Sequence, residues 1–154
     1  MLESLIQWYK YLRNERGGSP CPCTLDEGPS VGTEDATAVV LDGFIYFTGG
    51  IFSNKVSNSI HRYNIIKQSW ESVSNMNEQC CNHSVVSYRN KYIYMFGGFE
   101  LNDNYIYKSS VERYDPQQNS WFYVASMHQP QQKDSAFVYG DKIFLIGEHN
   151  PECV

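Results

Sequence analysis

The sequence contains an internal repeat, and its clearest mark is a pair of glycines at the end of an apolar run. The pair at 49–50 recurs at 97–98, 48 residues later. Each pair is followed by a polar loop, then by a Tyr and a Trp seven residues apart, and by a Met six residues after the Trp. Landmarks that recur in one order restrict the chain to a repeat architecture. They are Gly49, Gly50, Tyr63, Trp70 and Met76 in the first copy and Gly97, Gly98, Tyr114, Trp121 and Met127 in the second.

Each complete copy contains four short runs of β-branched and aromatic residues, which favour strands. Asp42 and Gly43 separate the first two runs, and an Asp-Gly pair in this position predicts a two-residue hairpin turn with positive φ at both residues. Two complete copies are therefore predicted to form four antiparallel strands each, and a third copy only its first hairpin. The runs are 38–41, 44–47, 59–63 and 70–73, then 84–88, 92–96, 110–114 and 121–124, then 136–139 and 142–147.

These strings resemble the kelch repeat, a unit of about 50 residues that forms one four-stranded blade of a β-propeller. Segments 45–50 and 93–98 look like the double-glycine strand of that family, and 111–116 with 119–121 is similar to its third and fourth strands. The resemblance covers 36–147 and implies an all-β fold with two complete kelch blades and half of a third. In such blades, the glycines permit close approach of a neighbouring blade, and Tyr and Trp fill the space between sheets.

Residues 1–16 are predicted to form a short amphipathic helix, because apolar residues recur there at three- and four-residue intervals. The segment 9–16 resembles the closing helix of the BACK domain that precedes the propeller in BTB-kelch proteins; a generic amphipathic helix is the alternative. Residues 17–35 are rich in Gly and Pro and are predicted to be a linker. The predicted units are the helix 1–16, the linker 17–35, kelch repeats 36–82 and 83–134, and a partial repeat 135–154.

Propellers close with four to eight blades, so two and a half blades leave sheet faces and edges open. The third copy also has Gly147-Glu148 where the others have two glycines. Three explanations compete: a fragment or truncated product, a splice variant, and a chain that completes its ring by oligomerising. We favour the first two.

Composition and motifs restrict the function. The net charge is −5, and no Lys/Arg cluster is present, which argues against nucleic acid or a membrane as a partner. The five cysteines lack C-x-x-C spacing and predict reduced thiols in a cytoplasmic protein. A sensing role for Cys80 and Cys81 is disfavoured, because no clustered positive charge lowers their pKa. Catalytic motifs are absent, so we expect no enzyme activity, no cofactor and no metal.

The resemblance implies a non-enzymatic protein-interaction module, similar to the substrate-recognition propeller of a BTB-kelch adaptor for a cullin-RING ubiquitin ligase. A cullin would bind through a BTB domain that is absent from this chain. One alternative is a kelch protein associated with actin or the cytoskeleton. Another is a fragment of a galactose-oxidase-like propeller enzyme, which requires Tyr, His and Cys ligands that converge on the channel; no such set is evident.

In kelch propellers, partners bind to loops after the double glycine and to loops that join successive blades. The resemblance therefore assigns partner contacts to these loops, where an exposed Phe beside Asn and charged residues suits a protein interface. The inter-blade loops lack the Pro-Arg pair that the family often carries. The predicted contact residues are Phe52, Ser53, Asn54 and Lys55; Phe99, Glu100, Asn102, Asp103, Asn104 and Tyr105; and, between blades, Gln79, Cys80, Asn82, Gln129, Gln131 and Gln132.

Overall fold

The computed structural model describes residues 34–102 and 104–147, and these residues form strands, turns and loops without a helix. The all-β prediction is confirmed. The predicted helix 1–16 and most of the predicted linker 17–35 lie outside the described residues. Within the described part, no helix has the length and apolar character needed to cross a membrane.

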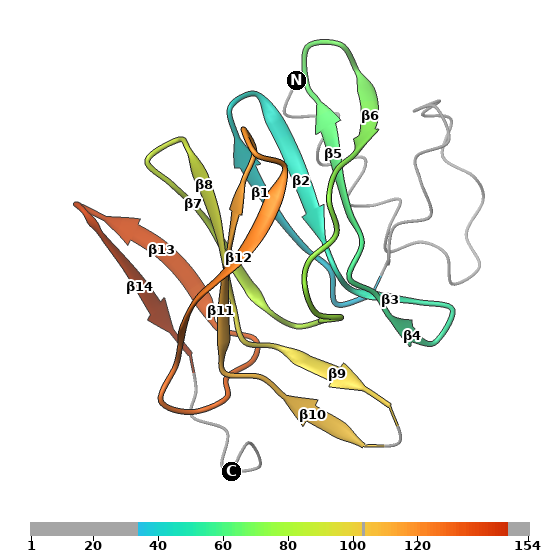
Figure 1. Ribbon diagram of the computed structural model, residues 1–154, viewed down its shortest axis with the longest axis vertical. Coiled ribbons are helices and arrows are strands. Elements are labelled where there is room, and N and C mark those ends of the chain that lie inside the picture. Colours follow the sequence, from blue (N-terminus) through green and yellow to red (C-terminus); the bar gives the residue numbers. More distant parts are fainter. Residues whose placement is uncertain (1–33, 103, 148–154) are drawn as a thin grey trace.

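Two four-stranded antiparallel sheets and one hairpin correspond to the three copies of the repeat (Figure 1). The first blade has the order β1-β2-β5-β6, the second β12-β11-β8-β7, and the third copy contributes only β13-β14. The predicted two blades and a half are thus confirmed. The strands are β1 Thr37–Leu41, β2 Phe44–Thr48, β5 Ile60–Asn64, β6 Ser69–Ser72, β7 Ser84–Tyr88, β8 Tyr92–Phe96, β11 Ser110–Asp115, β12 Ser120–Ser126, β13 Ser135–Tyr139 and β14 Lys142–Ile146.

The turn chemistry predicted for the first hairpin is also confirmed. Asp42 and Gly43 have φ values of 49° and 77°, as a two-residue turn between twisted strands requires. The β7–β8 turn also has two successive residues with positive φ, Arg89 at 53° and Asn90 at 48°. Tight turns therefore close the same end of both blades.

The polar loop after each glycine pair is a further hairpin, which the sequence patterns did not predict. The first contains β3 (Ile51–Phe52) and β4 (Lys55–Val56), and the second contains β9 (Phe99–Leu101) and β10 (Tyr105–Tyr107). In the first hairpin, Ser53 and Asn54 adopt left-handed conformations with φ of 49° and 62°, which makes a tight turn. Both hairpins extend from the end of the blades opposite the tight turns (Figure 1).

The main core lies between the first two blades. Leu41, Tyr46 and Ile60 of the first blade pack with Ile93 and Met95 of the second. Of the predicted Tyr and Trp landmarks, Tyr114 and Trp121 face each other across β11 and β12 and join this core, whereas Tyr63 and Trp70 pack on Ile45 and Phe47 in a separate cluster. The faces of the first two blades that meet are therefore buried by each other.

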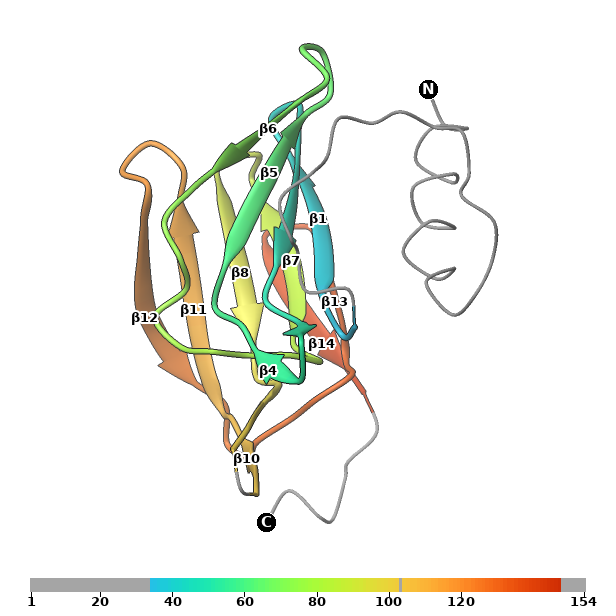
Figure 2. The same cartoon turned by 90° about the vertical axis from the view of Figure 1, so that its right-hand side faces the viewer.

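The same backbone hydrogen bond joins each copy of the repeat to the next. The N–H of Asn82 donates to the carbonyl of Asp35 at 3.0 Å, and the N–H of Lys133 donates to the carbonyl of Asn82 at 2.9 Å. All three residues have positive φ. These bonds hold β1, β7 and β13, the first strand of each copy, side by side (Figures 1 and 2). The copies are therefore consecutive blades of one propeller.

Candidate functional site

The two classes of loops that were predicted to bind a partner form one continuous surface. The N–H of Gly50 donates to the carbonyl of Cys80, and the N–H of Gly98 donates to that of Gln131. In addition, Cys81 and Phe99 exchange two backbone hydrogen bonds of 3.0 Å. Each hairpin is thus fixed to the inter-blade loop beside it. We call this surface the hairpin end: hairpins β3–β4 and β9–β10 with loops 77–82 and 127–133.

Most predicted contact residues of the hairpin end are accessible. Two aromatic side chains stand out, Phe52 with 46% and Tyr105 with 59% of their surface exposed. Ile106, which was not predicted, is 51% exposed on the face of β10 opposite Tyr105; the apolar run Tyr105-Ile106-Tyr107 was the available signal. Asp103 lies outside the described residues. Also exposed are Ser53, Asn54, Lys55, Gln79, Asn102, Asn104 and Gln129; Asn82, Glu100, Gln131 and Gln132 are half-buried.

Phe99 and Cys80 depart from the prediction of exposed contact residues. Phe99 is buried in a cluster with Val56 and Cys81. It lies one residue after its glycine pair, whereas the exposed Phe52 lies two residues after the first glycine pair. Successive side chains of a strand point to opposite faces, so this offset reverses their exposure. Cys80 is fully buried, and its thiol donates to the carbonyl of Gly97 at 3.0 Å. Neither side chain presents a surface to a partner.

The buried cysteines are poor nucleophiles. Burial raises the pKa of Cys80 and of Cys81 to about 12, and the nearby Lys108 offsets only part of that rise. Both thiols are therefore protonated near neutral pH, and a thiol rather than a thiolate reacts slowly with electrophiles. This environment argues against a sensing role. In the described part of the chain, no three His, Cys, Asp or Glu side chains are grouped as a metal site would need.

Lys108 connects the parts of the hairpin end. Its ammonium group lies 2.9 Å from a carboxylate oxygen of Glu78, in the inter-blade loop, and 3.3 Å from one of Glu100, on β9. Tyr123 and Ser110 also donate hydrogen bonds to Glu78. Burial alone would raise the pKa of Glu78, but Lys108 together with the hydrogen bonds from Tyr123 and Ser110 outweighs burial and lowers that pKa. Isolated charges 30 residues apart gave no sequence signal for this network.

His83 lies at the junction of the first two blades and is almost fully buried. The hydroxyl of Thr48 donates to the carbonyl of Thr37, so Nε2 of His83 is the donor in its 2.7 Å hydrogen bond to that hydroxyl. Its Nδ1 is buried and has no hydrogen-bond partner. A second proton would therefore be placed on an unpaired buried nitrogen, and burial lowers the pKa of His83 to about 4.

We expect the free energy of unfolding to fall as the pH decreases from about 6.5 to about 4. In this window the unfolded chain binds a proton at His83 and the folded chain does not, so protonation favours unfolding. The pKa difference corresponds to a loss of at most about 3 kcal/mol. Burial lowers the pKa of His61 and adds to the effect, whereas it raises the pKa of Glu112 and opposes it. Urea unfolding at a series of pH values measures the slope.

His83→Gln should reduce this pH dependence, and His128→Gln, at an exposed position, should leave it unchanged. A His83→Gln variant that keeps the full slope would show that another group causes it.

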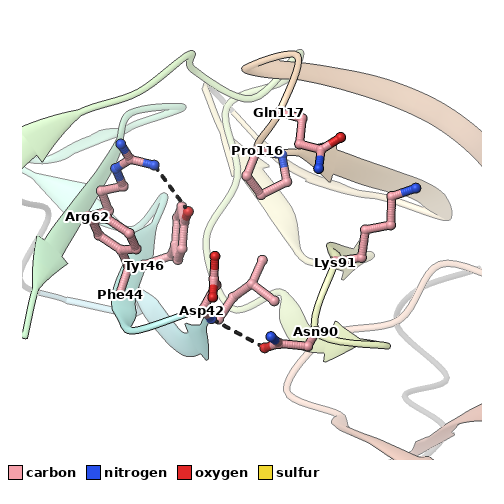
Figure 3. Close-up of a pocket in the computed structure, with 9 residues that line it drawn as sticks. Asp42, Phe44, Tyr46, Arg62, Asn90, Lys91, Pro116 and Gln117 are labelled. Atoms are coloured by element: carbon pink, nitrogen blue, oxygen red, sulfur yellow. Dashed lines mark hydrogen bonds between the residues drawn. The ribbon is translucent and has the colours of Figure 1, made fainter.

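A pocket lies at the other end of the same blades, among the tight turns (Figure 3). It has a volume of about 240 Å³. Arg62 is held on one side by Glu71, at 2.6 Å, and by the hydroxyl of Tyr46, at 3.4 Å. We call this cavity the turn pocket. It is lined by Leu41, Asp42, Phe44, Tyr46, Arg62, Asn90, Lys91, Pro116 and Gln117, and none of these residues was predicted as a contact.

Comparison with known proteins agrees with the architecture. The KLHDC2/KLHL20/DRC7 Kelch-repeats domain matches residues 19–148. Kelch-like protein 36 of Mus musculus is 33% identical over 116 residues, which cover 72% of this chain and 18% of that protein. Kelch-like protein 15 of Danio rerio is 30% identical over 127 residues, covering 70% of this chain and 21% of that protein. The chain therefore spans about a fifth of the length of these curated relatives.

Among solved structures, that of YjhT superposes with a TM-score of 0.67 at 18% identity. The match covers 80% of this chain and 36% of that one. At this identity the likeness concerns the fold.

Proposed function

Since this chain belongs to the kelch-repeat family, we propose that it is a non-enzymatic module that binds a protein partner through the hairpin end. The observation that carries the proposal is the joining of hairpins and inter-blade loops into one surface by the bonds from Gly50 and Gly98. On that surface Phe52, Tyr105 and Ile106 are exposed, and aromatic side chains contribute much of the affinity in protein interfaces.

The finer proposal is a substrate-recognition propeller of a BTB-kelch adaptor that serves a cullin-RING ubiquitin ligase in the cytoplasm. The similarity to Kelch-like proteins 36 and 15 supports it. A second support is the resemblance of segment 9–16, which lies outside the described residues, to the end of a BACK domain. A role in binding actin or another cytoskeletal protein is the competing proposal, because the same surface would serve it.

A double substitution, Phe52→Asp with Tyr105→Asp, should reduce the recovery of partners from cells at least about tenfold. Both side chains are about half exposed, so their replacement removes apolar contacts and adds charge without emptying the core. Affinity capture followed by quantitative mass spectrometry measures the recovery against the unmodified chain.

Ile66→Asp is the matched control, because Ile66 is 89% exposed in the β5–β6 turn, away from the hairpin end. It should capture the same partners as the unmodified chain. If the double variant also captures them equally, the hairpin end is not the binding surface.

The ligase role is tested separately with a form of the protein that carries a BTB domain. A cullin should co-purify with that form. Failure to recover a cullin would exclude the adaptor role, and the capture experiment with residues 1–154 would still report on the hairpin end.

A further inference from the structure

We propose that the turn pocket binds a basic side chain, Lys or Arg, of a partner protein. The pocket exists only where two blades meet: Leu41 to Tyr46 come from the first blade, and Asn90, Lys91, Pro116 and Gln117 from the second. It lies at the start of β2, whereas the hairpin end begins after the last residue of that strand. The inference therefore does not depend on the hairpin end.

The floor of the turn pocket is apolar and well ordered by packing. Leu41 and Tyr46 are almost fully buried, and the Tyr46 ring packs on that of Tyr114 at 5.8 Å between centroids. Pro116 forms part of the opposite wall. The methylene groups of a Lys or Arg side chain can lie along such a surface while the charged group reaches polar atoms.

The negatively charged group in the turn pocket is the carboxylate of Asp42. Its backbone N–H donates to Asn90 at 3.3 Å, but its carboxylate makes no hydrogen bond or ion pair with the residues that the structure describes. Figure 3 shows Asp42 between Tyr46 and Arg62 on one side and Asn90 and Lys91 on the other. A charged hydrogen bond from a guanidinium or ammonium group is the strongest contact that this carboxylate can make.

The pocket also contains two cations, Arg62 and Lys91, but both already have partners, so they do not make it a site for an anion. Arg62 is already neutralised by Glu71, and its guanidinium carbon lies over the Phe44 ring at 4.2 Å. The Lys91 ammonium lies 4.8 Å from the centroid of the Tyr92 ring, so its charge already has a cation–π partner. An anion in the pocket would instead face the unpaired carboxylate of Asp42. The chain's net charge of −5 also attracts a basic partner.

The probe for this site is the amide of N-acetylarginine, titrated into the isotopically labelled 154-residue chain and followed by its amide NMR signals. We expect saturable shifts at Asn90 and Gln117, with a dissociation constant of about 1 mM for so small a ligand. The amide of N-acetylcitrulline has nearly the same shape without the charge and should give no saturable shift.

Asp42→Asn should weaken arginine binding at least about fivefold, because it removes the charge, whereas Asn tolerates the left-handed conformation of this turn. Gln117→Glu adds a carboxylate to the pocket and should strengthen binding about threefold. Asp141→Asn, in the β13–β14 turn outside the pocket, is the matched control and should bind as the unmodified chain does. Equal binding by Asp42→Asn, equal binding of the citrulline probe, or preferential binding of an N-acetylglutamate amide would overturn the proposal.

Discussion

Replacing Gly49 with Ala should lower the free energy of unfolding by about 2–4 kcal/mol. Gly49 has a φ of 58°, and a side chain in this left-handed region costs about 1 kcal/mol. An added Cβ would also overlap the carbonyl oxygen of Cys80, and overpacking of this kind costs about 1–3 kcal/mol more. That carbonyl accepts the hydrogen bond from Gly50, so moving it would loosen the joint between the first blade and the inter-blade loop.

Gly43→Ala separates the two causes. Gly43 also has positive φ, 77°, but an added Cβ would meet no atom within 4 Å. Its replacement should therefore cost only about 1 kcal/mol, from backbone strain. Urea unfolding followed by Trp fluorescence compares the two variants. If they lose the same free energy, the close approach to Cys80 has no energetic role, and the double glycine matters for its conformation alone.

The strands of the blades could be predicted because their determinants are local. The Asp42-Gly43 turn fixes one hairpin by its own backbone preference, and the recurrence of Tyr and Trp marks the other. The hairpins after the glycine pairs were missed because β3 and β4 have only two residues each, and β9 and β10 only three. Such short runs give no alternation of apolar and polar residues, and their pairing depends on the left-handed conformations of Ser53 and Asn54.

The candidate sites were harder to predict than the fold, because they depend on contacts between distant segments. The positions of Phe52 and Phe99 relative to their glycines were visible in the sequence, and counting strand alternation from each pair would have separated the exposed side chain from the buried one. By contrast, the turn pocket joins turns of two blades, and Glu78 meets Lys108 only after both blades have formed. A single sequence contains no pattern that links such positions.

Replacing Tyr114 with Ala should destabilise the chain by about 3–5 kcal/mol, the usual cost of removing a large buried aromatic side chain. Tyr114 is fully buried between the blades, with its ring 5.8 Å from that of Tyr46 and 5.2 Å from that of Trp121. Its hydroxyl donates to Asn119 at 2.8 Å. The same oxygen of Asn119 accepts a 2.9 Å bond from the backbone of Ser74, so the substitution also removes a hydrogen bond that positions Asn119 for this link between the blades.

Two variants test this explanation by the same urea unfolding measurement. Tyr114→Phe keeps the ring and removes the hydroxyl, so it should cost about 1 kcal/mol, the typical contribution of one hydrogen bond. Tyr139→Ala removes a tyrosine of β13 that is 77% exposed, and it should cost less than about 1 kcal/mol. If Tyr114→Ala were no more costly than Tyr139→Ala, the two blades would not be held together by their shared core. Their contact would then depend mainly on backbone hydrogen bonds such as those from Asn82 to Asp35 and from Gly50 to Cys80.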